Sequence, residues 1–438
     1  MENKNRSNLL LFTFTLAFTL NGWSNVDRAQ IDNWITDNPV LDPPSAGSVL
    51  TSQHLDQIEP WLPPGFIDEL QFPEFSMKIQ ANKPQPAHKS YLSATMAFKG
   101  QASLGEDGRL NGYTAGLPFS QEQIANSDET TAGYMVAWNN IHRWQYFGYQ
   151  VDELTMAYVG AESGPAPLAT EEGLIGGGQL DRLLSQSYHR VYLNHLAMLP
   201  NQQYKVKLQD SNTRFFKDYI EFLAPFNVKG TKFVVERMLD PVADDQVNTY
   251  LPTERRIRRF SAKERSDSFM GSEATLDDFD GFSGRVLDYK WRYLGRKKIL
   301  SIANSVQPLL TVYGPHSRVP KDEWQIRDCH AVEVTSTWDG HPYKSRVLLI
   351  DKETYGVSMS LIFRRDNTLW KTMQTIHRGP RDVSKLELSV PSWRGQINID
   401  RYSNTTTVVR TKTDTLNPTM TTREIKRIFN VSSLTEGQ

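Results

Sequence analysis

The strongest constraint on the fold is a two-residue alternation of side chains, which begins after Tyr204 and continues through the second half of the chain. Successive side chains of a β-strand point to opposite faces of its sheet, so a period of two predicts strands. The clearest case places large apolar side chains at every second position: Val357, Met359, Leu361 and Phe363. Ser358 and Ser360 lie between them. One face of this strand is therefore expected to be buried.

Three such segments follow one another, over residues 346–350, 356–364 and 369–378. The runs between them, residues 351–354 and 365–368, have the composition of turns. Strands separated by short turns predict an antiparallel meander.

Helices are expected to be few. Thr51 or Ser52 can cap a short helix that leads through Pro60 to a second turn near Leu70, and residues 129–148 carry the best helical periodicity. Residues 91–98 alternate and predict a strand, whereas residues 160–178 are rich in Gly and Pro and predict a loop. Strands and helices do not alternate regularly, which disfavours a doubly wound parallel sheet. We therefore expect a mainly antiparallel α+β fold, with a curved sheet and a β-rich core over approximately residues 204–430.

The N-terminus has the features of a signal peptide. Lys4 and Arg6 precede an uncharged apolar run, residues 9–20, and Gly22 and Ser24 are small residues at the two positions that a signal peptidase reads. Cleavage after Ser24 is expected, with cleavage after Ala29 as the weaker alternative. The run is too short to cross a bilayer as a helix. We therefore predict that residues 1–24 are removed and that residues 25–438 form one domain in the periplasm, without a transmembrane span.

Composition excludes several classes of partner and anchor. Cys329 is the only cysteine, so no disulfide can form within the chain, and no cysteine follows the predicted cleavage site to be lipidated. Because Cys329 lies in a strand-like run, we expect it to be buried in the core. The chain carries 49 basic and 50 acidic residues, so nucleic acid and anionic membrane surfaces are poor candidates as partners.

Motifs for catalysis and for metal or cofactor binding were not found. The sequence has no nucleophile elbow, phosphate loop or zinc-binding helix motif, and His189 and His195 do not have the spacing of a metal pair. The acidic run from Asp277 to Gly281 lacks the alternating oxygen ligands of a calcium loop, so it is expected to be a solvated turn or a charged latch. We predict a protein that is not an enzyme and has no metal or cofactor.

A basic run lies shortly before that acidic run. In a strand, alternation divides its four arginines between two faces, which weakens any nucleic-acid patch. Carboxylates within a hairpin's length are natural partners for guanidinium groups. The predicted ion-pair network joins these residues: Arg255, Arg256, Arg258 and Arg259 with Asp277, Asp278 and Asp280.

Several spaced motifs together resemble a known family. These are residues 250–260 (YLPTERRIRRF), 267–272 (DSFMGS), 276–279 (LDDF) and 289–291 (YKW), with GYTAGLPF at 112–119 and the Trp138-Asn139 pair upstream. The chain resembles a family of Gram-negative envelope proteins, of formally unknown function, that are named for outer-membrane lipoprotein sorting. The resemblance implies a fold like the carriers LolA and LolB, a strongly curved, half-open β-barrel closed by helices around an apolar cavity. It also implies an accessory role beside RND-type exporters.

These observations favour a periplasmic carrier or chaperone that shields a lipid or another hydrophobic molecule. The predicted cavity residues are mainly apolar side chains of the meander, joined by one tryptophan of the family motif: Val357, Met359, Leu361, Phe363, Trp370 and Trp291. The alternatives are a periplasmic hydrolase of glycans or esters, and a non-catalytic scaffold of an envelope complex. A fully packed core is the alternative explanation of the apolar stripe.

Overall fold

The computed structural model describes residues 23–37, 41–162, 169–260 and 262–435. The predicted signal peptide, residues 1–24, falls almost entirely on residues 1–22, which lie outside the described residues. In the described part of the chain, no helix combines the length and the apolar character that crossing a membrane requires.

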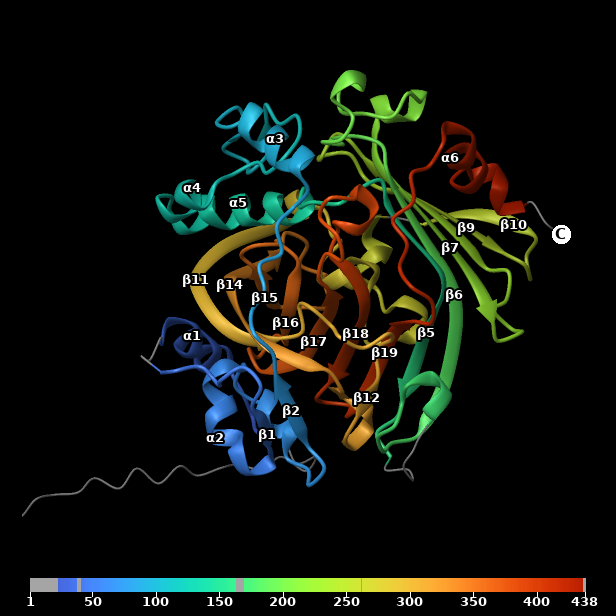
Figure 1. Ribbon diagram of the computed structural model, residues 1–438. Helices are drawn as coiled ribbons and strands as arrows, with labels where there is room; N and C mark the ends of the chain where they lie inside the picture. The colour runs from blue at the N-terminus through green and yellow to red at the C-terminus, as the bar shows by residue number, and fades with distance from the viewer. Residues whose placement is uncertain (1–22, 38–40, 163–168, 261, 436–438) are drawn as a thin grey trace, which may run out of the picture.

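One sheet of fifteen strands dominates the fold (Figure 1). Its strands follow the order β1-β2-β14-β15-β16-β17-β18-β19-β5-β6-β7-β8-β9-β10, and β11 pairs with β14. The pairings are antiparallel except that of β14 with β2. The strands of this sheet are β1 (Val49–Thr51), β2 (Ser76–Ile79), β5 (Gly148–Val159), β6 (Leu180–Tyr192), β7 (Arg214–Ala224), β8 (Lys232–Met238), β9 (Gln246–Leu251), β10 (Arg256–Phe260), β11 (Tyr289–Ser301), β14 (Glu323–Ser336), β15 (Ser345–Asp351), β16 (Val357–Phe363), β17 (Leu369–Arg378), β18 (Ser392–Asp400) and β19 (Thr405–Thr411).

Two small hairpins and six short α-helices complete the regular structure of the described residues. The hairpins are β3 (Ser103–Leu104) with β4 (Leu110–Asn111), and β12 (Val312–Tyr313) with β13 (Val319–Pro320). The helices are α1 (Arg28–Thr36), α2 (Leu55–Ile58), α3 (Lys89–Ala97), α4 (Gln121–Ala125), α5 (Glu129–Ile141) and α6 (Thr422–Ile428). The mainly antiparallel α+β class predicted from the alternation is thus confirmed, and the sheet is open rather than closed into a barrel.

The structure agrees with the predicted elements where the sequence has a strong period. The meander is formed by β15, β16 and β17 at the predicted positions, and Cys329 lies fully buried in β14. Thr51 caps a short 3-10 helix that leads into α2. The helix predicted over residues 129–148 is α5; Asp128 accepts hydrogen bonds from the backbone N–H groups of Thr130 and Thr131 in its first turn, and the helix ends at Ile141.

Two predictions about element type and extent were wrong. Residues 91–98 form helix α3, because Tyr91 and Ala94, three positions apart, are the side chains that the helix buries and His88 caps its first turn. The β-rich part of the chain begins at residue 148 rather than near 204, since β5 and β6 are interior strands of the main sheet. Both strands have irregular pairing registers, which break the alternation in their sequences.

The sheet curves strongly around residues 276–283. In a flat sheet β15 and β6 would lie six strand spacings apart, roughly 29 Å. Yet Asp278 contacts Arg346 of β15, and Ser283 contacts Arg190 of β6. One short segment thus contacts strands from both halves of the sheet, and Figure 1 shows that the sheet curves around it so that the two halves face each other.

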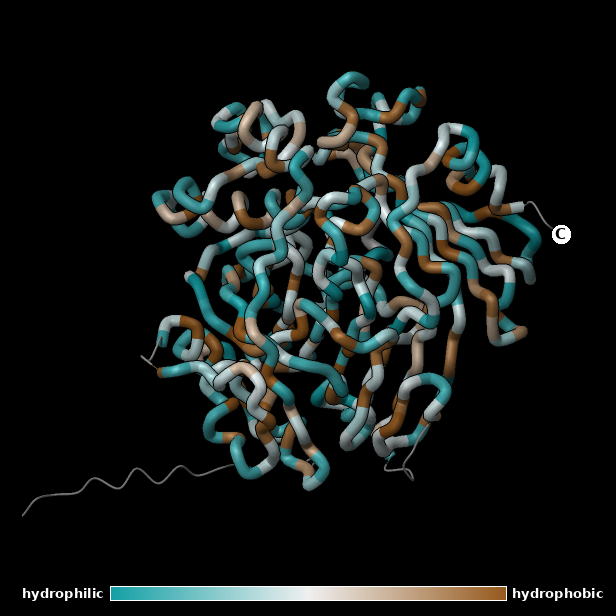
Figure 2. The backbone as a smooth tube through the Cα atoms, in the orientation of Figure 1, coloured by the Kyte–Doolittle hydropathy of each residue, from teal (hydrophilic) through white to brown (hydrophobic). Residues whose placement is uncertain are grey.

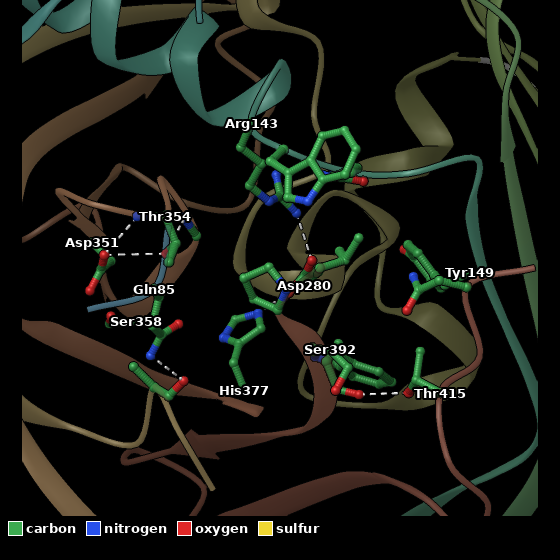
Figure 3. Close-up of a pocket in the computed structure, with 18 of the residues that line it drawn as sticks. Gln85, Arg143, Tyr149, Asp280, Asp351, Thr354, Ser358, His377, Ser392 and Thr415 are labelled. Carbon is green, nitrogen blue, oxygen red and sulfur yellow. Dashed lines mark hydrogen bonds and ion pairs between the residues drawn. The ribbon is translucent and has the colours of Figure 1, made fainter. Parts of the chain in front are cut away.

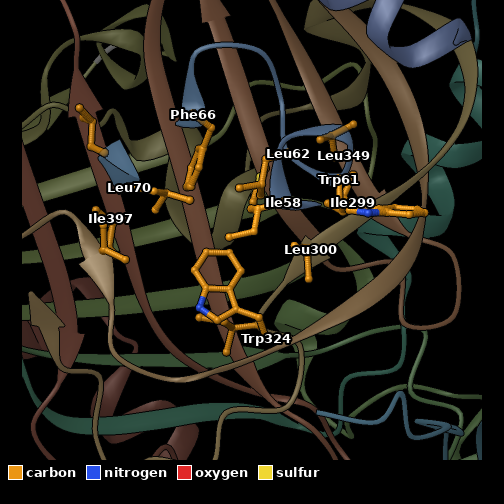
Figure 4. Close-up of a cluster of buried hydrophobic side chains, with 14 of the residues drawn as sticks. Ile58, Trp61, Leu62, Phe66, Leu70, Ile299, Leu300, Trp324, Leu349 and Ile397 are labelled. Carbon is orange, nitrogen blue, oxygen red and sulfur yellow. The ribbon is translucent and has the colours of Figure 1, made fainter. Parts of the chain in front are cut away.

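The other face of strands β14–β18 packs against the N-terminal segment, residues 23–79. Its apolar side chains, among them Trp61, Phe66 and Leu70, lie against Leu349, Ile397 and Trp324 in one closed core (Figure 4). In β14 and β15 alternate side chains enter opposite cores, since Leu349 faces the N-terminal segment and Leu348 faces α5. Both faces of this half of the sheet are thus buried.

One carboxyl group is buried within the first of these cores. Glu69 is 5% exposed, and its Oε1 accepts a hydrogen bond of 3.3 Å from the Thr372 hydroxyl. Its Oε2 has no hydrogen-bond partner among the described residues. Burial raises the pKa of Glu69 to about 7, although Arg318 and Arg401 act in the opposite direction.

Glu69 should therefore make the fold less stable at alkaline pH. The folded-state pKa is above the unfolded value, so the stability linked to the proton is complete below pH 4.5 and is lost as the pH rises through about 7. The loss approaches about 3 kcal/mol at high pH. In thermal unfolding between pH 5 and pH 9, Glu69→Gln should melt higher than the wild type at pH 9, with a difference that shrinks toward pH 5. The exposed Glu254→Gln is the control and should give a difference independent of pH; a Glu69→Gln difference equally independent of pH would contradict the prediction.

Candidate functional site

The candidate site is built around a long connection between the sheet's two halves. Residues 264–288, here called the strap, follow β10 and precede β11 and lie inside the curve of the sheet. At its centre is the 3-10 element η9 (Leu276–Gly281), which is capped by Thr275 in a capping box with Asp278. Two residues of the strap that are not glycine, Met270 and Asp280, have positive φ angles of 53° and 50°. Such angles are unfavourable for these residue types and persist only where surrounding contacts hold them.

Three aspartates of the strap form buried ion pairs, and two of them, Asp278 and Asp280, bind distant elements. Asp277 pairs with Arg265 at 2.8 Å, within the strap itself, and accepts a hydrogen bond from the Tyr289 hydroxyl. Asp278 pairs with Arg346 of β15 at 2.6 Å and accepts a hydrogen bond from Tyr343.

The third aspartate is Asp280, and its contact with Arg143 is drawn as a dashed line in Figure 3. It pairs with Arg143, just beyond α5, at 2.6 Å and with His377 of β17 at 2.9 Å. Burial opposes ionisation of Asp280, but Arg143 and His377 outweigh it and hold the pKa of this carboxyl below its usual value. The same balance, with Arg265 as the main opposing group, lowers the pKa of Asp277. Both carboxylates are therefore ionised at neutral pH.

An aromatic side chain of the strap is inserted between these anchors. Phe279 stacks on Tyr188 of β6 with ring centroids 4.5 Å apart, and its ring lies 6.2 Å from Tyr149 and 5.1 Å from Trp393. Arg190, whose guanidinium lies 5.8 Å from the Phe279 ring, forms two hydrogen bonds to Asp218 and one to Ser283 of the strap. Phe279 thus fills an aromatic cage on the inner face of the sheet.

A cavity of about 60 Å³ remains between the strap and strands β5–β8, β18 and β19. Its walls are mostly apolar, including Leu154, Met156, Ile220 and Val409. Two polar atoms in this wall, Trp393 Nε1 and Gln186 Oε1, are buried without a hydrogen-bond partner among the described residues. With the strap in place, this space holds only a few water molecules.

Two further cavities adjoin the strap. One, of about 40 Å³, is drawn in Figure 3, and Arg143, Asp280 and His377 are among the residues that line it. The other, of about 220 Å³, lies near the last residues of the strap and is lined by rings that include Tyr113, Trp138 and His195. All three spaces therefore border the same segment.

Comparison with known proteins gives the family. A model described as a protein of unknown function, DUF1329, matches residues 49–435. The chain belongs to the DUF1329 family. An uncharacterized protein of Pseudomonas aeruginosa, PA3922, is 23% identical over 358 residues, which cover 74% of this chain and 68% of that protein.

Solved structures give weaker likenesses. A domain from Vibrio parahaemolyticus whose name refers to outer membrane lipoprotein sorting is 16% identical, with a TM-score of 0.46, and covers 69% of this chain and 97% of that domain. A DUF1329 protein of Desulfovibrio piger is 17% identical, with a TM-score of 0.45 over 70% of this chain and 100% of that one. A LolA superfamily protein of Nitrosomonas europaea has a TM-score of 0.37 and 11% identity over 68% and 97%. The resemblance to a family of formally unknown function is thus confirmed by the match over residues 49–435.

The ion pairs predicted between the basic and acidic runs of this DUF1329 protein are corrected by the structure. Arg255, Arg256, Arg258 and Arg259 are exposed, and Arg256 and Arg258 pair with Glu254. Asp277, Asp278 and Asp280 are buried and pair instead with the residues described above. The prediction was wrong because the strap leaves the β9–β10 hairpin and runs across the inner face of the sheet.

The six predicted cavity residues do not lie together. Met359, Leu361 and Phe363 are at most 1% exposed and belong to the closed core under the N-terminal segment, so assigning them to a ligand cavity was wrong. A register shift between β15 and β16 turns Val357 to the opposite face, where it and Trp291 pack near α5. Trp370 is half-buried beside Tyr343, and its Nε1 donates to Asp400.

Sequence reasoning missed most of the residues that do line the site. Phe279, Tyr188 and Trp393 come from the strap, β6 and β18, and no spacing in the sequence relates them. The one available signal was the acidic run around Asp278, for which a charged latch was one of two interpretations.

Removing the Asp278 carboxylate should lower the free energy of unfolding far more than removing one partner of an exposed ion pair. Arg346 is 1% exposed, so Asp278→Ala leaves a buried guanidinium without its carboxylate and should cost about 3–5 kcal/mol of unfolding free energy. Chemical denaturation measures this directly. Glu254→Ala, which removes the partner of two exposed arginines, is the matched control and should leave the midpoint nearly unchanged. Equal midpoints for Asp278→Ala and wild type would show that the strap is not anchored there.

Proposed function

We propose that this protein is a periplasmic carrier or chaperone, and that it binds an apolar, lipid-like molecule in the space that the strap now fills. The observation that carries this proposal is the insertion of Phe279 into the cage of Tyr149, Tyr188 and Trp393. That cage belongs to a hydrophobic cluster on the inner face of β5–β9, β18 and β19, and side chains of the strap pack against it.

The contacts that hold the strap allow it to act as a lid. Besides its ion pairs, the strap contacts the sheet through separate rings, those of Phe269, Phe279 and Phe282, and two of its backbone positions have unfavourable φ angles. A ligand that buries the same apolar surface, at ~25 cal/mol per Å², can replace the contacts of Phe279. The ligand must then bind the form with the strap displaced more tightly than the form with the strap in place.

Unpaired polar atoms refine the class of ligand. Trp393 Nε1 is a hydrogen-bond donor and Gln186 Oε1 an acceptor, and both are buried in the wall of the cavity. The Trp393 N–H needs an acceptor and the Gln186 oxygen needs a donor, so an apolar molecule that carries a hydroxyl group, or a carbonyl together with a hydroxyl, would satisfy both. We therefore propose a ligand with an apolar body and at least one hydrogen-bonding group.

The alternative of a hydrolase has less support. His377 and Asp280 form a pair beside the cavity of about 40 Å³, an arrangement that would suit His377 as a general base. However, Arg143 also binds Asp280, and within the described residues no serine or threonine hydroxyl bonds to the His377 ring. The scaffold alternative does not explain an apolar cage with unpaired polar atoms.

Substituting the inserted ring should expose the site. Phe279→Ala should bind the fluorescent apolar probe N-phenyl-1-naphthylamine about tenfold more tightly than wild type, as expected when a ligand buries roughly 55 Å² more apolar surface. Fluorescence titration gives the two dissociation constants. The control is Phe75→Ala, which removes a buried ring from the core under the N-terminal segment. If both variants bind the probe equally, the site is not at the cage.

A ligand acquired in the cell provides the complementary test. Native mass spectrometry of protein purified from the periplasm of a Gram-negative host should show a bound apolar molecule, and Phe279→Asp should reduce its occupancy. Protein that is always empty, together with no gain of probe binding by Phe279→Ala, would exclude the carrier proposal and favour the scaffold.

Export and the exporter are further parts of the proposal. We propose that the chain is exported to the periplasm through its N-terminal signal and acts beside an RND-type exporter. Trp23 is 6% exposed, and Arg401 lies over its ring at 4.3 Å; Ser24 donates two hydrogen bonds to Asp68. These contacts support cleavage before Trp23 rather than after Ser24. N-terminal sequencing of the mature protein should therefore find a first residue at or before Trp23. A first residue of Asn25 would instead support the cleavage after Ser24 that the sequence predicts.

A further inference from the structure

The two turns at the far end of strands β7–β10 form one exposed surface. The β7–β8 connection covers residues 225–231, and the β9–β10 connection covers residues 252–255. Lys232 pairs with Tyr250 across β8 and β9, so both turns lie at the same end of these strands. A side chain added at Gly230 would come within 3.4 Å of Pro252, which places the two turns in contact.

An aromatic side chain projects from this end. Phe226 is 94% exposed, the highest value for a large apolar residue among the described residues, and Leu223 beside it is 36% exposed. Figure 2 shows hydrophobic colour at the tip of this hairpin, at the lower right of the view. A single exposed apolar side chain is ordinary, so Phe226 alone carries no conclusion.

The charges around Phe226 supply the second observation. Among the described residues in the two turns or within four positions of them, six side chains are basic and two, Glu221 and Glu254, are acidic. The basic ones are Lys229, Lys232, Arg255, Arg256, Arg258 and Arg259. Glu254 pairs with Arg256 and Arg258, and Glu221 lies 4.0 Å from Lys232, so a net charge of four positive units remains at this end from six basic and two acidic groups. The whole chain is nearly neutral, and its overall charge therefore conceals this cluster.

We propose that this surface, defined by Phe226, Leu223 and the basic side chains of the two turns, docks on the surface of an anionic phospholipid bilayer. An aromatic ring at a membrane interface buries its apolar part among the acyl chains, while flanking Lys and Arg side chains bind phosphate headgroups. Each basic side chain near an anionic surface adds roughly fivefold to the affinity. A solvent-exposed acidic protein surface would match the charges but would leave Phe226 exposed. This inference is independent of the proposed carrier function.

Sedimentation with vesicles tests the docking surface. The full-length mature protein should sediment with vesicles of phosphatidylcholine that contain 30% phosphatidylglycerol and should not sediment with vesicles of pure phosphatidylcholine. The expected difference arises because a net charge on the order of four positive units is attracted only to the anionic vesicles. Phe226→Ser should weaken binding about tenfold or more, because the ring no longer enters the acyl region. Arg255→Glu with Arg259→Glu should abolish it. Binding of the wild type should fall as salt is raised.

Controls separate this surface from general stickiness. Val242→Ser removes a 51% exposed apolar side chain from the turn at the opposite end of β8 and β9, and Lys99→Glu reverses an exposed charge next to α3; both should bind like wild type. All substituted residues are exposed, so circular dichroism should show unchanged folding. The proposal is overturned if wild type binds neither vesicle, if it binds both equally, or if either the Phe226 or the arginine variant binds like wild type.

Discussion

The ion pair between Asp278 and Arg346 is the interaction on which the rest of the structure depends. Neither side chain is more than 1% exposed, and the pair joins the strap to β15 in the interior of the molecule. Two buried charges are stable only when each satisfies the other, so this contact fixes the strap's position rather than adding much net stability. Asp277 and Asp280, with their own partners, set the orientation of the same short segment, and Phe279 between them can enter the aromatic cage only in that orientation.

The two faces of the sheet have different roles. On one face the N-terminal segment makes a continuous apolar core that contains Met359, Leu361 and Phe363. On the other face the strap makes a small number of ionic and aromatic contacts and leaves cavities on either side. Dense apolar packing resists change, and the buried ion pairs hold the strap in one position on the other face. Because cavities remain beside the strap on that face, it is the face suited to binding.

Much of the fold was predictable from the sequence, and little of the site was. The strands β15–β17 could be located because their period of two is uninterrupted, and α5 because its cap and its apolar face agree. Helix α3 was missed because Leu92 and Met96, exposed on its surface, gave the segment an alternating pattern. Arg143, Arg346 and His377 bind two neighbouring aspartates from three distant parts of the chain, and such pairings depend on the tertiary fold alone.

The pairing of β19 with β5 has a consequence for how the protein reaches its folded state. These two strands join the halves of the sheet, and Val408 lies opposite Ala157 across some 250 residues of chain. Contacts between such distant residues form late, because the intervening chain must first be closed into a loop. During synthesis, β5–β10 emerge from the ribosome long before their partner does. Until β19 arrives, that half has an unpaired edge at β5, and it needs protection from aggregation for as long as the rest of the chain takes to emerge.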